Sequence, residues 1–301
     1  MITYLQALIL GLIQGVTELF PISSLGHSVL VAYVLNWHNV IKQESANESQ
    51  FLSFLVVMHL ATAVALIYFY RAEWRRIIAG LFQSVKTKTY WNHKNKDSKM
   101  GWLLIAATIP AGLFGVVFEH HLRSQFAKPF SAMFFLIVNG FILLAGDRYI
   151  KQHPVHRSRQ GSSLAKTNQH TSEKLTLPRA MLIGVAQIGA LFAGISRSGI
   201  TMVSGLYSDL THEDAARFSF LLATPIILAA GVYKLPDFLG PNGNGVRGQE
   251  LAGALVAGIA AYFSVKYLDK YFKNRDLKPF GLYCIGAGLF ILLLGIYRGH
   301  F

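Results

Sequence analysis

Four polar side chains that could do chemistry fall within ten residues of an otherwise apolar N-terminal region. In the segment TELFPISSLGHSVL they are Glu18, Ser23, Ser24 and His27. A carboxylate, a hydroxyl and an imidazole are the groups that act as base, nucleophile and proton carrier in enzymes. The segment is therefore a candidate reactive cluster.

The residues around this cluster predict a helix, a loop and a second helix. Gln14 lies four residues before Glu18, on the same face of the first helix. Pro21 interrupts that helix because it lacks an N–H group and clashes with the preceding turn. Gly26 permits a tight turn, after which the return helix begins.

A second polar segment, GISRSGIT, is typical of an anion-binding loop. Its candidate residues are Gly194, Ser196, Arg197, Ser198, Gly199 and Thr201. Backbone N–H groups at the start of a helix attract anions. An arginine there can hold a phosphate through two parallel hydrogen bonds. A polar turn is the alternative interpretation of this segment by itself.

The two segments align with each other at an offset of 173 residues, which indicates an internal repeat. The aligned pairs include Gly11 with Gly184, Gln14 with Gln187, Ser23 with Ser196, and Gly26 with Gly199. Each segment is followed by three apolar stretches. These are 51–70, 101–118 and 130–146 in the first half, and 218–235, 250–265 and 280–297 in the second.

The composition predicts a membrane protein. The chain is 52% hydrophobic and 14% charged, with a mean hydropathy of +0.39. The six stretches approach the roughly 20 residues that a helix needs to cross a bilayer. The arms at 28–36 and 202–208 are too short to cross, so we expect two re-entrant hairpins. Three crossings per half then require the two halves to have inverted topology.

Basic residues predict which side of the membrane each loop occupies. With residue 1 outside, 21 of the 28 Lys and Arg residues fall on the cytoplasmic side and six outside. Both termini are therefore expected outside, and the net charge of +13 needs no nucleic-acid partner. Residues 71–99 should include a short amphipathic helix on anionic lipid.

The expected organisation is an all-α integral membrane protein with about six full spans and two re-entrant hairpins. Residues 1–147 form the first repeat, 148–178 a basic cytoplasmic linker, and 179–301 the second, inverted repeat. The N-terminus lacks the features of a signal peptide. The single cysteine, Cys284, can form no internal disulfide.

Glu18 and Arg197 are the charged residues that lie inside apolar segments, one in each half. Burial of a charge in hydrocarbon costs at least ~2.5–3.5 kcal/mol, so such residues usually face a cavity and a partner. We expect the two to meet. The alternative is a salt bridge that only joins the two hairpins.

The motifs resemble those of the undecaprenyl-diphosphate phosphatases of the bacitracin-resistance type. QGVTELFPISSLGH is similar to a family stretch of the form (E/Q)-x-x-x-E followed by P-x-S-S-x-G-H. AGISRSGIT is similar to P-G-x-S-R-S-x-x-T, and EDAARFSFLLATP also looks like a family segment. The resemblance covers nearly the whole chain. It departs at Ala193, which replaces the motif proline, and at Leu25, where many members have a hydroxyl residue.

The resemblance implies hydrolysis of undecaprenyl diphosphate to the monophosphate in the bacterial inner membrane, at a site open to the periplasm. This reaction recycles the cell-wall lipid carrier and confers bacitracin resistance. The implied catalytic residues are Glu18, Ser24, His27 and Arg197. The implied substrate-binding residues are Gln14, Ser23, Gly26, Ser196, Ser198, Gly199 and Thr201. The family also implies a divalent cation, Mg2+ or Ca2+, and we assign Glu18 and Gln14 as its ligands. For the oligomeric state, a homodimer is one alternative that stays open.

Several alternatives stay open at this point. Ser24 is our candidate nucleophile with His27 as its proton carrier, and in the competing mechanism Ser24 orients the substrate while water attacks. His59 is either a packed neutral histidine or a residue that supports the site, and His120 and His121 are expected in solvent. A transporter for a phosphate-bearing lipid would need the same Arg197 but not the Ser24 and His27 pair. A purely structural protein is the third class.

Overall fold

The structure, a computed structural model, describes residues 2–37, 39–40, 50–90, 95–118, 128–153, 175–239 and 245–299. Residues 50–53 and 235–239 are described by their backbone alone. Every regular element in these ranges is a helix. The first half contains α1 (Tyr4–Thr17), α2 (Ser24–Val34), α4 (Gln50–Phe69), α5 (Arg71–Lys86), α6 (Lys96–Val117) and α8 (Pro129–Gln152). The second half contains α11 (Leu177–Ala186), the 3-10 helix η1 (Gln187–Leu191), α12 (Arg197–Tyr207), α13 (His212–Leu239), α14 (Arg247–Tyr271) and α15 (Lys278–Tyr297).

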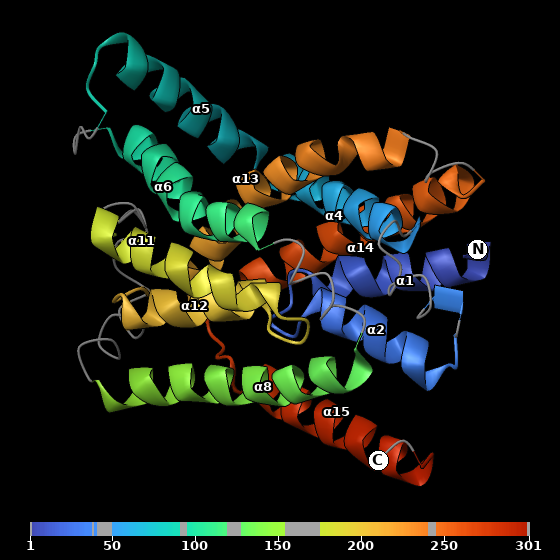
Figure 1. The fold of residues 1–301 in the computed structure, drawn as a ribbon. Helices are drawn as coiled ribbons and strands as arrows, with labels where there is room; N and C mark the ends of the chain where they lie inside the picture. Colours follow the sequence, from blue (N-terminus) through green and yellow to red (C-terminus); the bar gives the residue numbers. More distant parts are fainter. Residues whose placement is uncertain are drawn as a thin grey trace.

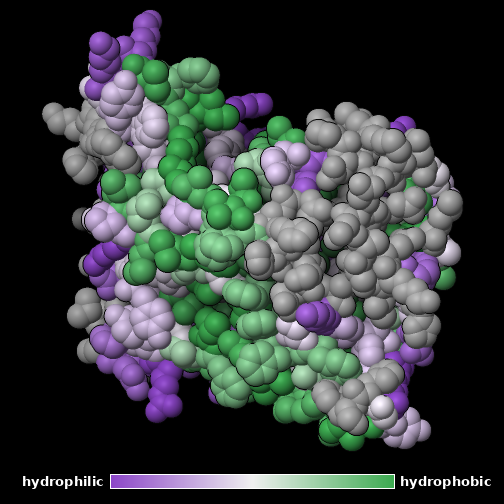
Figure 2. Space-filling model, viewed as in Figure 1, coloured by the Kyte–Doolittle hydropathy of each residue, from purple (hydrophilic) through white to green (hydrophobic). Residues whose placement is uncertain are grey.

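Five of the described helices, α6, α8, α13, α14 and α15, are long and apolar enough to cross a membrane. The number becomes six if α4 and α5, which meet at an angle of 86°, are counted as one span. The chain is therefore a multi-pass helical membrane protein. Figure 2 shows the matching surface, with a broad hydrophobic area across the middle and hydrophilic residues toward the left edge.

The helix α5 is the amphipathic helix expected after the first span. Its buried side packs on α6, where the indole N–H of Trp102 donates to the Ser84 hydroxyl at 3.0 Å. Ile78 and Phe82 lie on its exposed side. The helix α8 continues through Gln152, so it includes the first residues of the stretch expected as the basic linker, 148–178. Residues 154–174, most of that linker, lie outside the described residues.

The polar motifs lie at the ends of short helices. The helices α2 and α12 have 11 residues each, which is about 16 Å of helix against a hydrocarbon core of about 30 Å. Neither can cross the bilayer alone. In the second half α11 gives way to η1 at Gln187, so its α-helical part has ten residues.

The first helix of each half packs closely against a long helix of the other half. A Cβ atom at Gly11 on α1 would lie 2.3 Å from the carbonyl oxygen of Gly253 on α14. A Cβ atom at Gly184 on α11 would lie 2.3 Å from the carbonyl oxygen of Ala107 on α6. Small residues permit such close backbone contact between membrane helices. These contacts fix α1 against α14 and α11 against α6. The helices α8 and α15 lie side by side along the lower edge of the bundle (Figure 1).

Candidate active site

Glu18 and Arg197 form an ion pair that joins the two motifs. The guanidinium Nη2 of Arg197 donates to Glu18 Oε1 at 3.0 Å, and its Nη1 donates to the carbonyl oxygen of Ser219 on α13 at 3.3 Å. The Glu18 side chain is 5% exposed and that of Arg197 is 14% exposed. The meeting of these two charges, expected from the sequence, is confirmed.

The second carboxylate oxygen of Glu18 collects three polar neighbours. Gln14 Nε2 donates to Oε2 at 3.0 Å, and the Ser24 hydroxyl donates to the same atom at 2.6 Å. His59 Nε2 on α4 lies 3.3 Å from it. Glu18 is therefore the centre of the site, and it takes contacts from α1, α2, α4 and α12.

The loop between α1 and α2 brings Ser24 to Glu18. The helix α1 ends at Thr17 with Glu18 as its C-cap, and Ser23 then adopts a positive φ of 72°. Ser23 caps α2 by accepting from the N–H of Gly26 at 3.3 Å, and it also accepts from the N–H of Gly194 at 3.2 Å. A Cβ atom at Gly26 would lie 3.0 Å from Gly194 Cα, so a glycine permits the close approach of the two loops.

The second loop is braced by the hydroxyl residues that we expected to bind substrate. Ser196 caps α12 through the N–H of Gly199 at 3.1 Å, and its hydroxyl lies 3.0 Å from that of Ser198. Ser198 donates to the carbonyl oxygen of Phe20 at 3.2 Å in the first loop. Thr201 donates to the carbonyl oxygen of Arg197 at 2.7 Å and lies equally close to the Ser219 hydroxyl. These groups shape the loop that carries Arg197.

Asn139 on α8 binds both loops and was missed by the sequence analysis. Its side-chain N–H donates to the carbonyl oxygen of Pro21 at 3.0 Å, and its Oδ1 accepts from the N–H of Ser196 at 3.0 Å. The same amide donates to the sulfur of buried Cys284 at 3.4 Å. An asparagine inside an otherwise apolar span was the available signal, because a buried amide requires polar partners.

His27 contacts Tyr283 on α15 and does not bond to Ser24, its expected partner. Its Nδ1 lies 2.7 Å from the carbonyl oxygen of Ser23, its Nε2 lies 2.9 Å from the Tyr283 hydroxyl, and the two rings stack at 5.6 Å. No hydrogen bond joins His27 to Ser24 in the described part of the chain. The expected proton path from Ser24 to His27 has no direct hydrogen bond in this structure, since the hydroxyl of Ser24 donates to Glu18. The catalytic role of His27 stays a prediction.

His59 lies against Glu18, as the second of the two interpretations left open requires. Its ring contacts Glu18 through Nε2, and its Nδ1 lies 2.7 Å from the carbonyl oxygen of Leu55. His120 and His121, expected in solvent, lie outside the described residues.

Glu18 and Gln14, the residues assigned to a divalent cation, do not form a site that could bind the cation through protein ligands alone. Both oxygens of Glu18 already accept from N–H or O–H donors, and two of its neighbours, Arg197 and His59, can carry positive charge. Gln14 Oε1 is buried and has no hydrogen-bond partner, but one amide oxygen is a poor site for a hard cation, which takes about six oxygen ligands. The described residues include no group of three or more His, Cys, Asp or Glu side chains that could hold a metal ion.

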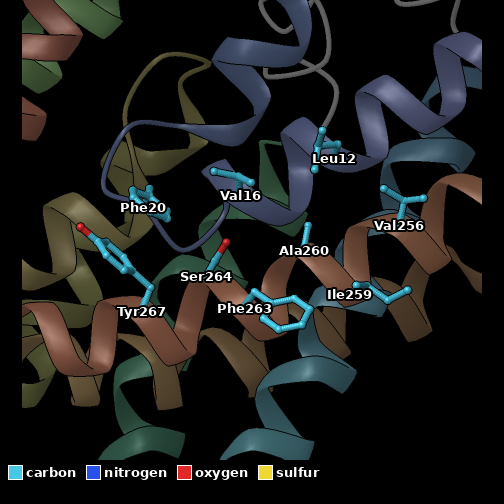
Figure 3. A pocket seen from close by; sticks show the side chains of 9 residues that line it. All are labelled: Leu12, Val16, Phe20, Val256, Ile259, Ala260, Phe263, Ser264 and Tyr267. Carbon is cyan, nitrogen blue, oxygen red and sulfur yellow. The ribbon is translucent and has the colours of Figure 1, made fainter.

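An apolar groove of about 470 Å³ lies on another face of α1, against α14 (Figure 3). Leu12, Val16 and Phe20 face side chains of α14 that include Phe263 and Tyr267. Gln14 and Glu18 do not line it, because they lie on the other side of the helix at 100° per residue. The groove is therefore separate from the polar cluster.

Comparison with known proteins shows the family of the chain. A family model described as bacitracin resistance protein BacA matches residues 7–290. Three similar proteins are undecaprenyl-diphosphatase 2 of Frankia alni, undecaprenyl-diphosphatase of Mycolicibacterium paratuberculosis and undecaprenyl-diphosphatase 2 of Burkholderia thailandensis. Their identities to this chain are 43%, 46% and 44%. The alignments cover 95%, 95% and 94% of this chain and 96%, 95% and 94% of the relatives. Because both the family model and these relatives cover nearly its whole length, the chain belongs to the bacitracin resistance protein BacA family.

Proposed function

We propose that this protein is an integral membrane phosphatase that hydrolyses undecaprenyl diphosphate to undecaprenyl phosphate and inorganic phosphate. The names of its relatives support the substrate and the reaction. The observation that carries the proposal is the Glu18 carboxylate, which contacts the Ser24 hydroxyl on one oxygen and the Arg197 guanidinium on the other. The proposed nucleophile Ser24, its base Glu18 and the phosphate-binding guanidinium of Arg197 thus meet at one buried place.

Arg197 and two helix N-termini would hold the diphosphate. The helices α2 and α12 both begin beside Glu18, at Ser24 and Arg197. The first N–H groups of a helix have no acceptors within that helix. Ser23 and Ser196 cap only the N–H groups of Gly26 and Gly199. The positive ends of both helix dipoles would therefore favour a polyanion at this point.

In the proposed reaction Glu18 takes the proton of Ser24, and Ser24 Oγ attacks the terminal phosphorus of the lipid diphosphate. The bond from that phosphorus to the bridging oxygen breaks, and undecaprenyl phosphate leaves. Water then hydrolyses the phosphoserine and releases inorganic phosphate. Ser24 is assigned as nucleophile because its hydroxyl donates to Glu18 at 2.6 Å. In the alternative Glu18 activates water directly, and trapping of a phosphoserine at Ser24 separates the two.

The dependence on Mg2+ or Ca2+ stays a prediction of the family resemblance, and none of these steps uses the cation. Phosphate release measured with EDTA and then with each cation restored tests it. Release that EDTA leaves unchanged would contradict the prediction.

We propose an inverted repeat in which the α1–α2 and α11–α12 segments are re-entrant, with both termini and the active site on the periplasmic side. The support is threefold. First, the equivalent residues Gly11 and Gly184 make the same close contact, with α14 and α6 respectively. Second, the helices α2 and α12 are too short to cross the bilayer. Third, basic residues are concentrated in the expected cytoplasmic loops. Figure 1 places the start of α1 and the end of α15 on the same side of the view. A homodimer stays an untested prediction.

Phosphate release by the purified protein tests the function. The protein in detergent, given a prenyl diphosphate with Mg2+ or Ca2+, is expected to release inorganic phosphate, and its Ser24→Ala variant is not. Binding of the lipid without phosphate release under any cation would contradict the proposal and favour a lipid transporter.

A further inference from the structure

His59 is the most exposed member of the Glu18 cluster and has no role in the proposed reaction so far. Its side chain is 29% exposed, against 14% for Arg197 and 5% for Glu18. It belongs to α4, a helix outside both motifs. Its Nε2 lies 3.3 Å from Glu18 Oε2, on the oxygen that Arg197 does not contact.

The groups beside the two ring nitrogens of His59 indicate which of these nitrogens carry protons. Nδ1 lies 2.7 Å from the carbonyl oxygen of Leu55, which can only accept, so Nδ1 carries a proton. Nε2 faces the Glu18 carboxylate, which the adjacent Arg197 guanidinium keeps ionised and which can therefore also only accept. The acceptors beside both ring nitrogens favour the imidazolium form of His59. In that form Glu18 has a cationic neighbour on each oxygen.

Substrate binding creates a need for the second cation. In the structure Arg197 is already bound to Glu18, and a diphosphate must draw the same guanidinium onto its own oxygens. A buried carboxylate that loses its counter-ion beside an arriving polyanion is strongly destabilised. His59 would stay on Oε2 while Arg197 turns toward the phosphate.

On the basis of the proposed function, we propose that His59 is a positioning residue that remains the counter-ion of Glu18 when Arg197 binds the diphosphate. It has two separable contributions. The Nε2–H donor fixes the direction of the carboxylate and hence of the Ser24 hydroxyl bonded to it. The positive charge lowers the cost of moving Arg197 from Glu18 to the substrate.

Two substitutions separate these contributions from simple packing. His59→Gln keeps an N–H donor but removes the charge, and His59→Leu removes both while it fills similar space. The charge contribution predicts that His59→Gln raises KM about tenfold, which is ~1.4 kcal/mol, while kcat changes less than about threefold. The donor contribution predicts that His59→Leu also lowers kcat by at least about tenfold. Met58→Leu, a conservative change at the neighbouring buried residue, is the matched control and is expected to leave kcat and KM unchanged.

A binding measurement keeps this inference separate from the proposed function. A prenyl methylenebisphosphonate, which cannot be hydrolysed, is titrated onto wild type and both variants, after their thermal unfolding in detergent shows that each is folded. We expect about tenfold weaker binding for His59→Gln, and this readout holds even if wild type releases no phosphate. Wild-type affinity and wild-type KM in a folded His59→Gln variant would overturn the counter-ion role. Equal kcat in His59→Leu and wild type would overturn the positioning role.

Discussion

The hydroxyl of Ser24 donates to Glu18 Oε2 at 2.6 Å, across a loop in which only five residues separate the two. This bond needs the reversal of chain direction at Ser23, whose φ of 72° is a conformation that non-glycine residues rarely adopt. Since Arg197 binds the other oxygen of the same carboxylate, the orientation of Ser24, the proposed nucleophile, and the position of the Arg197 guanidinium depend on one side chain.

Replacement of Glu18 by Gln should nearly abolish the turnover of the folded protein. The amide preserves the shape but cannot accept the Ser24 proton, and loss of a general base costs typically 10²–10⁴-fold in kcat. Phosphate release at saturating prenyl diphosphate measures the effect. Gln14→Leu is the matched control on the same helix face and should lose much less. A Glu18→Gln variant with more than about a tenth of wild-type kcat would argue against the base.

Asn139 should be required for stability more than for chemistry. Asn139→Leu removes the bonds to the carbonyl oxygen of Pro21 and the N–H of Ser196 and leaves both buried groups unpaired, at about 1–3 kcal/mol each. We expect a clear fall in the unfolding temperature in detergent. A Leu variant as stable as wild type would show that the two loops are held by other contacts.

The sequence predicted the contact between Glu18 and Arg197 because a buried charge needs a partner and each half supplied one. It also predicted a loop followed by a short helix in each motif, since the glycine, serine and proline signals there are local. It placed the helix starts after Gly26 and Gly199, whereas α2 begins at Ser24 and α12 at Arg197. The partner of His27 could not be predicted in this way. Tyr283 is 256 residues away in an apolar helix, and nothing local distinguishes it from a tyrosine that faces lipid.

Buried charges at the helix ends were missed for a similar reason. Asp147 and His212 are 3% exposed and bond to each other at 2.8 Å, although both lie at the edges of apolar stretches. Glu73, expected in a loop, pairs with Arg217. The sequence locates such residues near a membrane boundary, but tertiary packing decides whether they face water or a partner.

Alanine substitutions at Gly11 and Gly184 should destabilise the protein to similar extents. At each residue the new methyl group would lie 2.3 Å from a backbone carbonyl oxygen, and such overpacking typically costs about 1–3 kcal/mol. Unfolding temperatures in detergent measure the effect. Gly286→Ala is the control, because nothing lies within 4 Å of its added Cβ. If only one of the Gly11→Ala and Gly184→Ala variants were destabilised, α1 and α11 would not be equivalent. That result would contradict the inverted repeat, which depends on their equivalence.

Tyr283→Phe should show whether the hydroxyl next to His27 matters. The change removes the contact of 2.9 Å to Nε2 and preserves the stacked ring. Because this contact orients His27, whose catalytic role is a prediction of the sequence, kcat should fall by about three- to tenfold, as expected for the loss of one net hydrogen bond. Tyr297→Phe, on the same helix and 88% exposed, is the control. Equal kcat for Tyr283→Phe and this control would assign the contact to packing alone.

The central claim is that Glu18 and Arg197, from opposite halves of the chain, enclose the site where the diphosphate is cleaved. Its most direct test is the rate of inorganic phosphate release from a prenyl diphosphate by purified wild type and by a folded Arg197→Gln variant. We predict steady release by wild type and at least a hundredfold loss in kcat/KM for the variant. Release by the variant at a rate close to that of wild type would contradict the claim.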